Sequence, residues 1–432
     1  MPDIRPFRGL RYDMAQVGAL SDVVAPPYDV IDASLQDRLY DASPYNVVRL
    51  ELNRDEPDDA PGRDRHSRAA RFLKEWLRSG ILRPESHPAL YVYHQIFSID
   101  GRECTRRAFF ARLRVEPFGS GRIHPHEQTL PGPKADRLAL YRATDFNLSP
   151  IFGLYPDPTS EVQNALEAGI VDRTPMEAVD HLGVIHRLWP VEHSATHSTV
   201  QKLIGPAPVF IADGHHRYET ALAYRDERAA ALGGLDPDDP ANFCLAALVG
   251  MSDPGLIIQP THRLVSGFPG LTAEVLAARL AGQFAVEFVG EGDEGTRSAW
   301  ESIEINEDQD ILGFATTADN RRITARLLTD ERMDALCPEH GPEWRSLGVS
   351  VLHELVFRDL LGDLGAPSCR YVHRLDEVVA ATRDPGVDLA CLVPPATMDL
   401  VENIASNHEK MPPKSTYFYP KLLTGLVLNP LK

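Results

Sequence analysis

The sequence predicts an α+β protein built on a mixed β-sheet core, with an inserted α/β piece and a C-terminal α/β addition. Helix-periodic segments alternate with short strand-like segments along the whole 432-residue chain. The segment Phe243 to Met251 is apolar throughout, as expected for a central strand that is covered on both faces. Leu90 to Ile99 and Glu103 to Val115 flank an Asp-Gly pair, which is typical of a hairpin.

The length of the chain predicts more than one domain, because single hydrophobic cores stop growing beyond roughly 250–300 residues. We divide the chain into an N-terminal α+β region, a core region, a small α/β insert and a C-terminal α/β region that returns to the core. Their bounds are 1–120, 121–270, 271–345 and 346–432.

Three shorter segments complete the expected secondary structure. NVVRLEL (46–52) and LLTGLVL (422–428) have the apolar pattern of strands. The acidic segment EGDEG (291–295) is expected to be a loop between strands of the insert.

The net charge of the chain limits the classes of binding partner that it is expected to have. The formal net charge is −18, from 44 Lys and Arg against 62 Asp and Glu, which opposes broad contact with nucleic acid or acidic membranes. The N-terminal residues do not form a signal peptide, and no apolar run approaches the ~20 residues that a membrane span needs. We expect a cytoplasmic protein with small-molecule ligands and neither a nucleic-acid nor a membrane partner. The sequence indicates no oligomeric state.

Several familiar site types are absent from the sequence. The five cysteines are odd in number and lack C-x-x-C spacing, so neither a disulfide framework nor a structural zinc site is predicted. The motifs G-x-S-x-G, G-x-G-x-x-G and H-E-x-x-H do not occur. Hydrolase-elbow, Rossmann and zincin sites therefore lose their support.

The stretch PVFIADGHHRYETALAYR (Pro208 to Arg225) carries the strongest functional signal. An apolar strand turns at Asp213-Gly214 and continues as a helix whose first turn holds two histidines and an arginine. A helix N-terminus binds anions through its backbone N–H groups and its dipole, and an arginine adds a planar fork that suits phosphate. Phosphate-binding residues are thus expected at Gly214, His216 and Arg217. The alternative is a capped helix with surface histidines.

A second cluster, His124-Pro125-His126-Glu127, offers two imidazoles and a carboxylate. These groups can serve as acid and base or bind a divalent metal. We prefer Glu127 as a general base, because no third metal ligand is spaced nearby. A solvated loop is the alternative.

Two lysine-containing segments complete the set of candidates. Lys134 and Arg137 are three residues apart after a Gly-Pro turn, so they share a helix face that can clamp a phosphate. Lys414 and Ser415 belong to a segment rich in proline and aromatic residues, Met411 to Lys421, which is expected to close over the site. A plain surface helix and a core-covering tail are the respective alternatives.

Four segments resemble those of the domain of unknown function 1015 family. They are VVAPPYDVI, HEQTLPGPKADRLALYRATDFNLSPIFGLY, IADGHHRYETALAY and MPPKSTYFYPKL, and together they span nearly the whole chain. This family name implies no established activity.

The DGHHR segment is also similar to a signature of the ParB/sulfiredoxin-like superfamily, which includes CTP-binding partition proteins, sulfiredoxins and free-serine kinases. The resemblance to the kinase branch implies a ParB/sulfiredoxin-like core in which residues 213–217 face nucleotide phosphates. Glu127 is our own candidate for the base. His215 stands where sulfiredoxins have their reactive cysteine, so sulfiredoxin activity is not expected.

The sequence therefore predicts a nucleotide-binding phosphotransferase that acts on a small hydroxylated, serine-like metabolite with ATP or ADP and Mg²⁺. Such a transfer needs cations for the phosphates and a base for the acceptor. The expected catalytic residues are Glu127, Asp213 and His215, with Asp213 orienting Mg²⁺ or the acceptor. A non-catalytic nucleotide-binding switch is one alternative. The other is a phosphohydrolase with a metal bound by His124 and His126 together with the histidines of the DGHHR segment.

Overall fold

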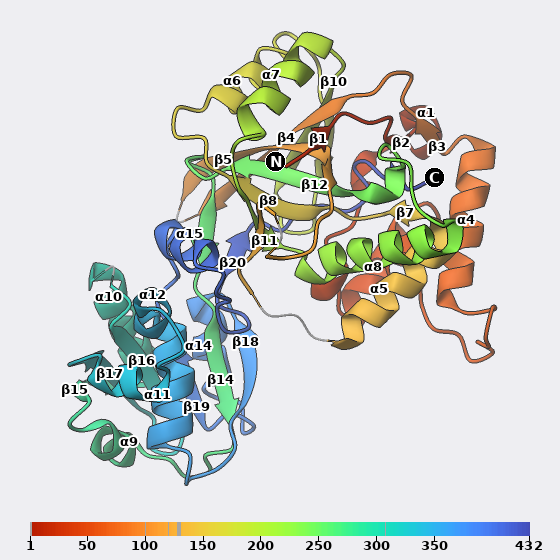
Figure 1. The fold of residues 1–432 in the computed structure, drawn as a ribbon. Coiled ribbons are helices and arrows are strands. Elements are labelled where there is room, and N and C mark those ends of the chain that lie inside the picture. Colours follow the sequence, from red (N-terminus) through yellow and green to blue (C-terminus); the bar gives the residue numbers. More distant parts are fainter. Residues whose placement is uncertain (1, 100, 120, 128–130, 307) are drawn as a thin grey trace. The chain divides into compact units, whose positions relative to one another are not determined.

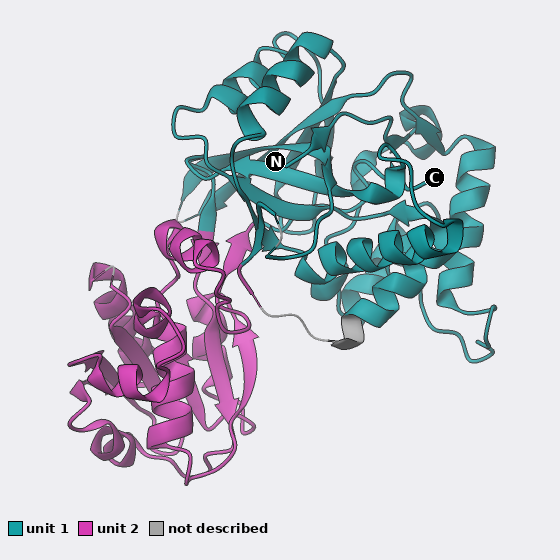
Figure 2. Cartoon of the chain, viewed as in Figure 1, with its two compact units in different colours: residues 1–125, 129–257, 420–432 teal, residues 126–128, 258–419 magenta. Residues whose placement is uncertain are grey.

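The structure of the protein is a computed structural model that describes residues 2–99, 101–119, 121–127, 131–306 and 308–432. It divides into two compact units (Figure 2). Unit 1 comprises Met1–Pro125, Thr129–Ile257 and Pro420–Lys432, and unit 2 comprises His126–Gln128 and Ile258–Tyr419. Each unit is assembled from separate chain segments, whereas the sequence analysis divides the chain into four consecutive regions.

Unit 1 is built on a nine-stranded sheet whose centre is β12 (Phe243–Gly250), and every residue of β12 is buried. β12 pairs parallel with β8 (Ile151–Tyr155) and antiparallel with β5 (Arg102–Arg114), so the sheet is mixed as predicted. The outer strands are β11 (Val209–Asp213) and β6 (Ile123–Pro125) beyond β8, and β4 (Leu90–Ile99), β10 (Ile185–Val191) and β9 (Met176–Val179) beyond β5. β1 (Ile4–Arg5) also pairs with β5.

The predicted hairpin is confirmed by the antiparallel pairing of β4 with β5, in which Ile99 lies opposite Arg102. Gly101 has a φ of 75°, which suits the tight connection. Asp100, the other residue of the predicted turn, lies outside the described residues.

Helices α5 (Pro131–Thr144) and α8 (His215–Leu232) lie side by side in unit 1 (Figure 1). α4 (Arg65–Ser79) packs on α5; it begins with a capping box between Asp64 and Ser67 and ends at the left-handed Gly80. The other elements of this unit include α1 (Met14–Val17), α2 (Ala33–Ala42), β2 (Leu10–Tyr12), β3 (Leu82–Pro84), α6 (Glu161–Glu167) and α7 (Ser194–Ile204).

The strand expected at 46–52 is wrong, because the chain forms the short helix α3 (Val48–Glu51) there. The cause is Asn46, which is fully buried. Its side-chain amide donates to the carbonyl oxygens of Asp22 and Val24, and its oxygen accepts from the N–H of Val48. These hydrogen bonds from one side chain to the backbone replace the ladder of a sheet.

The strand expected at 422–428 is also not formed as a regular strand. This segment makes isolated bridges at Thr424 and Leu428, and a short strand follows as β21 (Asn429–Pro430), paired with β7 (Phe146–Asn147). Gly425, with a φ of 98°, interrupts the extended backbone. The segment nevertheless packs on unit 1, since its leucines and valine are buried.

Unit 2 contains a six-stranded antiparallel sheet with helices on both faces. The strand order is β15 (Phe284–Glu291), β17 (Arg321–Leu327), β16 (Ile311–Thr316), β19 (Leu389–Leu392), β14 (His262–Ser266) and β18 (Ser368–Val372). One face packs on α9 (Ala273–Leu280), the π-helix η4 (Val351–Leu360) and α15 (Met398–Ser406). The other face packs on α10 (Gly292–Asn306) and α14 (Leu375–Ala381). Short helices α11 (Glu331–Leu336), α12 (Pro342–Ser346) and α13 (Gly348–Ser350) and the strand β20 (Tyr417–Tyr419) complete this unit.

The loop expected at EGDEG is wrong, because Glu291 ends β15 and the next four residues begin helix α10. Asp293 and Glu294 occupy its first turn, where negative charge is favourable to the helix dipole. Ala299 and Ile303, four residues apart, bury their side chains beneath the sheet. None of the helices in the described part of the chain is long and apolar enough to cross a membrane.

Candidate functional site

The predicted strand, turn and helix are observed in unit 1. β11 ends at Asp213, Gly214 occupies the N-cap position of α8, and the helix then continues for 18 residues. Gly214 has no side chain that could cap the N-terminus of this helix. Its first backbone N–H groups therefore lack an intrahelical partner and supply partial positive charge at the turn.

Gly214 is required at this turn for two reasons. Its φ of 85° lies in the left-handed region, which side chains with a Cβ rarely adopt. A Cβ added there would lie 3.0 Å from the guanidinium of Arg217, so the turn and this side chain approach each other closely. The glycine thus lets Arg217 fold back over the turn.

Asp213 is held by two cations. Nζ of Lys421 donates to Oδ2 of Asp213 at 2.6 Å, and Nη2 of Arg217 lies 3.5 Å from Oδ1. Burial alone raises the pKa of a carboxylate, but the charges of Lys421 and Arg217 hold the pKa of Asp213 well below its ordinary value. Asp213 is therefore ionised at neutral pH and is a weak base.

Arg217 is almost completely buried, since its side chain is 5% exposed. Its guanidinium donates to the carbonyl oxygen of Pro150, which directly precedes β8. Burial lowers the pKa of an arginine, but Asp213 and the nearby Asp29 outweigh this effect and raise the pKa of Arg217. Arg217 therefore remains a fixed positive charge at the end of β11.

The two histidines of the turn follow Gly214 directly. His215 is buried and His216 is half-buried. Positive charge on His215 also contributes to the low pKa of Asp213. The structure thus brings all five residues of the predicted segment together around one turn.

Lys134 and Arg137 lie on α5, which packs beside α8, but their surroundings differ. Nζ of Lys134 pairs with Oε2 of Glu219 on α8 at 2.7 Å, and the lysine side chain is 37% exposed. Arg137 is buried. Its guanidinium donates to the side chains of Asp136 and Glu51 and lies over the ring of Tyr28 at 4.3 Å. Internal partners therefore engage Arg137, which leaves Lys134 as the more accessible cation.

Glu127, Lys414 and Ser415 belong to unit 2, whereas the DGHHR turn belongs to unit 1. Oε1 of Glu127 accepts a hydrogen bond of 2.6 Å from the backbone N–H of Lys414, which has a φ of 60°. The hydroxyl of Ser415 donates to the carbonyl oxygen of Pro412 at 2.6 Å. Glu127 and the segment that contains Lys414 and Ser415 are thus neighbours within unit 2.

The histidines proposed as metal ligands occupy separate environments. His124 lies in β6 of unit 1 and stacks on Phe210, whereas His126 is buried in unit 2, 2.8 Å from the hydroxyl of Thr416. Among the described residues, the one cluster with the composition and spacing of a metal site is Glu56, Asp58 and Asp59. The histidine-based metal site therefore gains no support from the part of the chain that is described.

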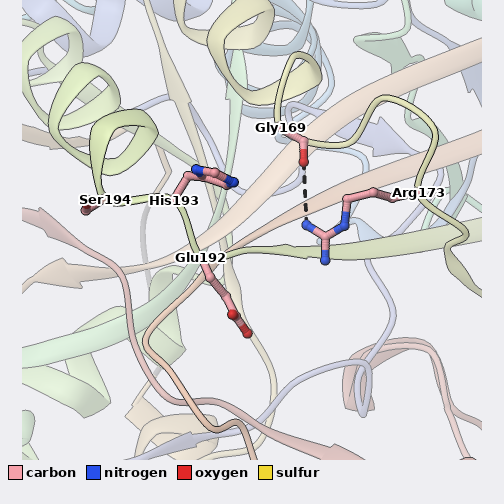
Figure 3. Close-up of a pocket in the computed structure, with 5 residues that line it drawn as sticks. All are labelled: Gly169, Arg173, Glu192, His193 and Ser194. Carbon is pink, nitrogen blue, oxygen red and sulfur yellow. Dashed lines mark hydrogen bonds between the residues drawn. The ribbon is translucent and has the colours of Figure 1, made fainter.

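A shallow pocket of about 480 Å³ lies elsewhere on unit 1. It is lined by Gly169, Arg173, Glu192, His193 and Ser194 (Figure 3). Arg173 donates to the carbonyl oxygen of Gly169, as drawn, and also to that of Pro190. None of the predicted site residues lines this pocket.

The family model for DUF1015, described as a protein of unknown function, matches residues 4–350. The chain belongs to the DUF1015 family. The resemblance noted in the sequence is thereby confirmed, although the family description assigns no activity. Among curated proteins, no significant match to this DUF1015 chain is found.

Several solved structures show a limited similarity to this DUF1015 protein. A mutant free serine kinase in complex with AMP has 12% identity and a TM-score of 0.34, and the match covers 69% of this chain and 84% of that chain. SbnI with a C-terminal truncation, from Staphylococcus aureus, has 13% identity and a TM-score of 0.35, with coverage of 74% and 87%. A conserved hypothetical protein from Pyrococcus furiosus has 13% identity and a TM-score of 0.33, with coverage of 69% and 87%. TM-scores of this size do not establish a shared fold.

The sequence reasoning missed residues that this DUF1015 structure places at the turn. Lys421 lies within the segment expected to close over the site, but only Lys414 and Ser415 were selected from it. Arg106 is fully buried, and the charge of Asp213 is one of those that raise its pKa against the effect of burial. The sequence does contain a signal for Arg106, because it lies within an apolar strand segment and a buried charge there needs a partner.

Proposed function

We propose that unit 1 binds the phosphate groups of a nucleotide at the turn between β11 and α8, and that the protein transfers a phosphoryl group to a small hydroxylated metabolite. One observation carries the proposal: Arg217 and Lys421 converge on the single carboxylate of Asp213 at the N-terminus of an 18-residue helix. The backbone N–H groups of the helix N-terminus add partial positive charge beside these two cations, which suits an anion, while Asp29 is a second negative charge that acts on Arg217.

The roles of the turn residues follow from this arrangement. The backbone N–H groups after Gly214 face the phosphates, and His216 and Arg217 supply further donors. Asp213 fixes the positions of its two cationic partners. His215 adds to the positive potential beside Asp213. Lys134 is a further cation that can neutralise phosphate charge.

Asp213 does not fit the role of a Mg²⁺ ligand in this arrangement, because each of its carboxylate oxygens faces a cation. Mg²⁺ typically keeps several waters and binds through substrate phosphates, with one or two carboxylates from the protein. In our proposal, Mg²⁺ therefore enters with ATP or ADP, and no step is assigned to a metal bound by Asp213.

A nucleotide-binding switch without turnover is the second candidate. It is favoured by the low pKa of Asp213, which makes this residue unsuited to accept a proton from a hydroxyl group. Glu127 belongs to unit 2, and its assignment as the general base stays a prediction of the sequence. The serine-like acceptor is likewise a prediction of the sequence.

A thermal-shift panel tests the binding step. We expect ATP, ADP, CTP or GTP, with or without Mg²⁺, to raise the Tm of the full-length protein, since a ligand at 100 times its Kd adds about 2.7 kcal/mol of stability. Arg217→Ala should abolish the shift. Arg225→Ala is the matched control, because Arg225 lies on the same helix and donates to Val115 away from the turn. No shift with any nucleotide would overturn the proposal.

A further inference from the structure

The C-terminal segment of unit 1 brings a lysine to the turn, and the sheet grips the backbone on both sides of that lysine. We infer that Lys421 contacts the phosphate groups directly and that Gln95 and Arg106 are its positioning residues. This inference rests on the proposed function and adds to it a ligand class, nucleotides recognised through their phosphates rather than through their base.

Side chains on two neighbouring strands each donate a hydrogen bond to the backbone beside Lys421. Nε2 of Gln95, on β4, donates to the carbonyl oxygen of Lys421 at 2.9 Å. The guanidinium of Arg106, on β5, donates to the carbonyl oxygen of Pro420 and to Oε1 of Gln95. Gln95 and Arg106 lie opposite each other in the hairpin, so one polar pair holds two consecutive peptide units.

Both positioning side chains are fully buried, which is costly for an amide and more so for a charge. Burial lowers the pKa of Arg106 to about 10, so it remains charged at neutral pH. Arg106 also lies over the ring of Phe152 at 4.8 Å. Apolar residues would pack at these two positions at a lower cost. We therefore infer that the polar pair is there to fix the backbone at Pro420 and Lys421.

The two cations of the turn, Lys421 and Arg217, differ in how far their side chains are exposed to solvent. The side chain of Lys421 is 16% exposed, against 5% for Arg217. Arg217 is directed to Pro150 and Asp213, whereas an ammonium group has three donors on a flexible stem. Of the two cations, Lys421 is therefore the more accessible to an entering phosphate oxygen.

Calorimetric titration of the full-length protein with adenosine, AMP, ADP and ATP tests this assignment. Lys421→Met removes the charge and keeps an unbranched side chain. We expect it to weaken ADP and ATP by about tenfold or more, because a hydrogen bond to a charged group is lost, and to leave any affinity for adenosine unchanged. Lys421→Arg should restore most of the loss.

Lys432→Met is the matched control. Nζ of Lys432 pairs with Oδ2 of Asp145 at 2.6 Å, so the control removes an ion pair of the same length, with a more exposed lysine, from the same segment. Its ADP affinity should equal that of the wild type. Equal ADP affinity in Lys421→Met and wild type, with the Tm lowered or not, would overturn the role of Lys421. Failure of the wild type to bind any nucleotide would overturn the proposed function as well.

A double-mutant cycle tests the positioning role. Gln95→Met should weaken ADP by a smaller factor than Lys421→Met, and the double variant should bind no more weakly than Lys421→Met alone. A merely structural role for Gln95 predicts instead that the two losses multiply. Circular dichroism at the assay temperature verifies that each variant is folded.

Discussion

Nζ of Lys421 lies 2.6 Å from Oδ2 of Asp213, although 208 positions separate the two residues in the sequence. The whole of unit 2 except His126–Gln128 is inserted between them. The pair joins the C-terminal segment to the turn after β11. It also brings a second cation to a turn that already holds Arg217.

The two glycines that bound α8 allow a controlled test of the turn. Gly214 and Gly233 have φ values of 85° and 72°. Alanine at either position costs about 1 kcal/mol of stability from the left-handed backbone. An added Cβ meets Arg217 at 3.0 Å at Gly214, whereas nothing lies within 4 Å at Gly233. We expect only Gly214→Ala to weaken ADP binding, measured by calorimetry beside urea unfolding.

Equal loss of ADP affinity in Gly214→Ala and Gly233→Ala would contradict this expectation. It would mean that the strain in α8, rather than the close approach to Arg217, governs binding.

Lys134 and Arg137 should differ in what their removal costs. Arg137→Met leaves Glu51 and Asp136 without their buried partner, so we expect a loss of about 3–5 kcal/mol in the free energy of unfolding and little change in ADP affinity once folded. Lys134→Met removes a lysine that is 37% exposed from its pair with Glu219, so we expect a loss below about 1 kcal/mol but weaker ADP binding. Urea denaturation and calorimetry measure the two effects.

The reverse pattern, in which Arg137→Met stays stable but loses ADP affinity, would restore Arg137 as a phosphate ligand.

The sequence analysis identified the parts of this site that depend on local chemistry. An apolar run, a glycine and a polar first turn are enough to predict β11, Gly214 and α8. The use of Arg137 could not be foreseen, because its partner Glu51 is distant in the sequence and lies in a segment expected to be a strand. Asn46 changes that segment into α3 through contacts with Asp22 and Val24, and a periodicity argument contains no such long-range term.

Glu127 provides the test of catalysis. Glu127→Gln removes the base but keeps a carbonyl oxygen that can accept from the N–H of Lys414. We expect turnover of ATP with a serine-like acceptor to be lost while ADP binding persists. Glu409→Gln is the control, because Oε1 of Glu409 accepts similarly from the N–H of Gly341 at 2.8 Å. Undiminished turnover in Glu127→Gln would remove Glu127 from this role.

Unit 2 should lose stability in mild acid because of His262. Burial, with help from Arg263 and His373, lowers the pKa of His262 to about 3, whereas an unfolded histidine has a pKa of about 6.5. The unfolded chain therefore binds the extra proton first. The contribution is fully present above about pH 6.5 and is lost as the pH falls toward about 3. Between pH 7.5 and pH 5.0 this loss amounts to about 2 kcal/mol.

Hydrogen exchange of the β14 amides, corrected for intrinsic rates, measures this effect. His262→Gln should reduce the pH dependence, and His193→Gln, at an exposed position in unit 1, should leave it unchanged. Identical pH dependence in the wild type and His262→Gln would show that the folded protein does not hold His262 in its neutral form.

The insertion of unit 2 also sets an order of events during synthesis. The ribosome makes β11, the turn and α8 long before Lys421, and it makes most of unit 2 in between. Until residues 420–423 emerge and reach β4 and β5, Gln95 and Arg106 have no backbone carbonyls from this segment to bind. The nascent chain can therefore form its turn early, but it acquires the second cation only after unit 2 has been translated.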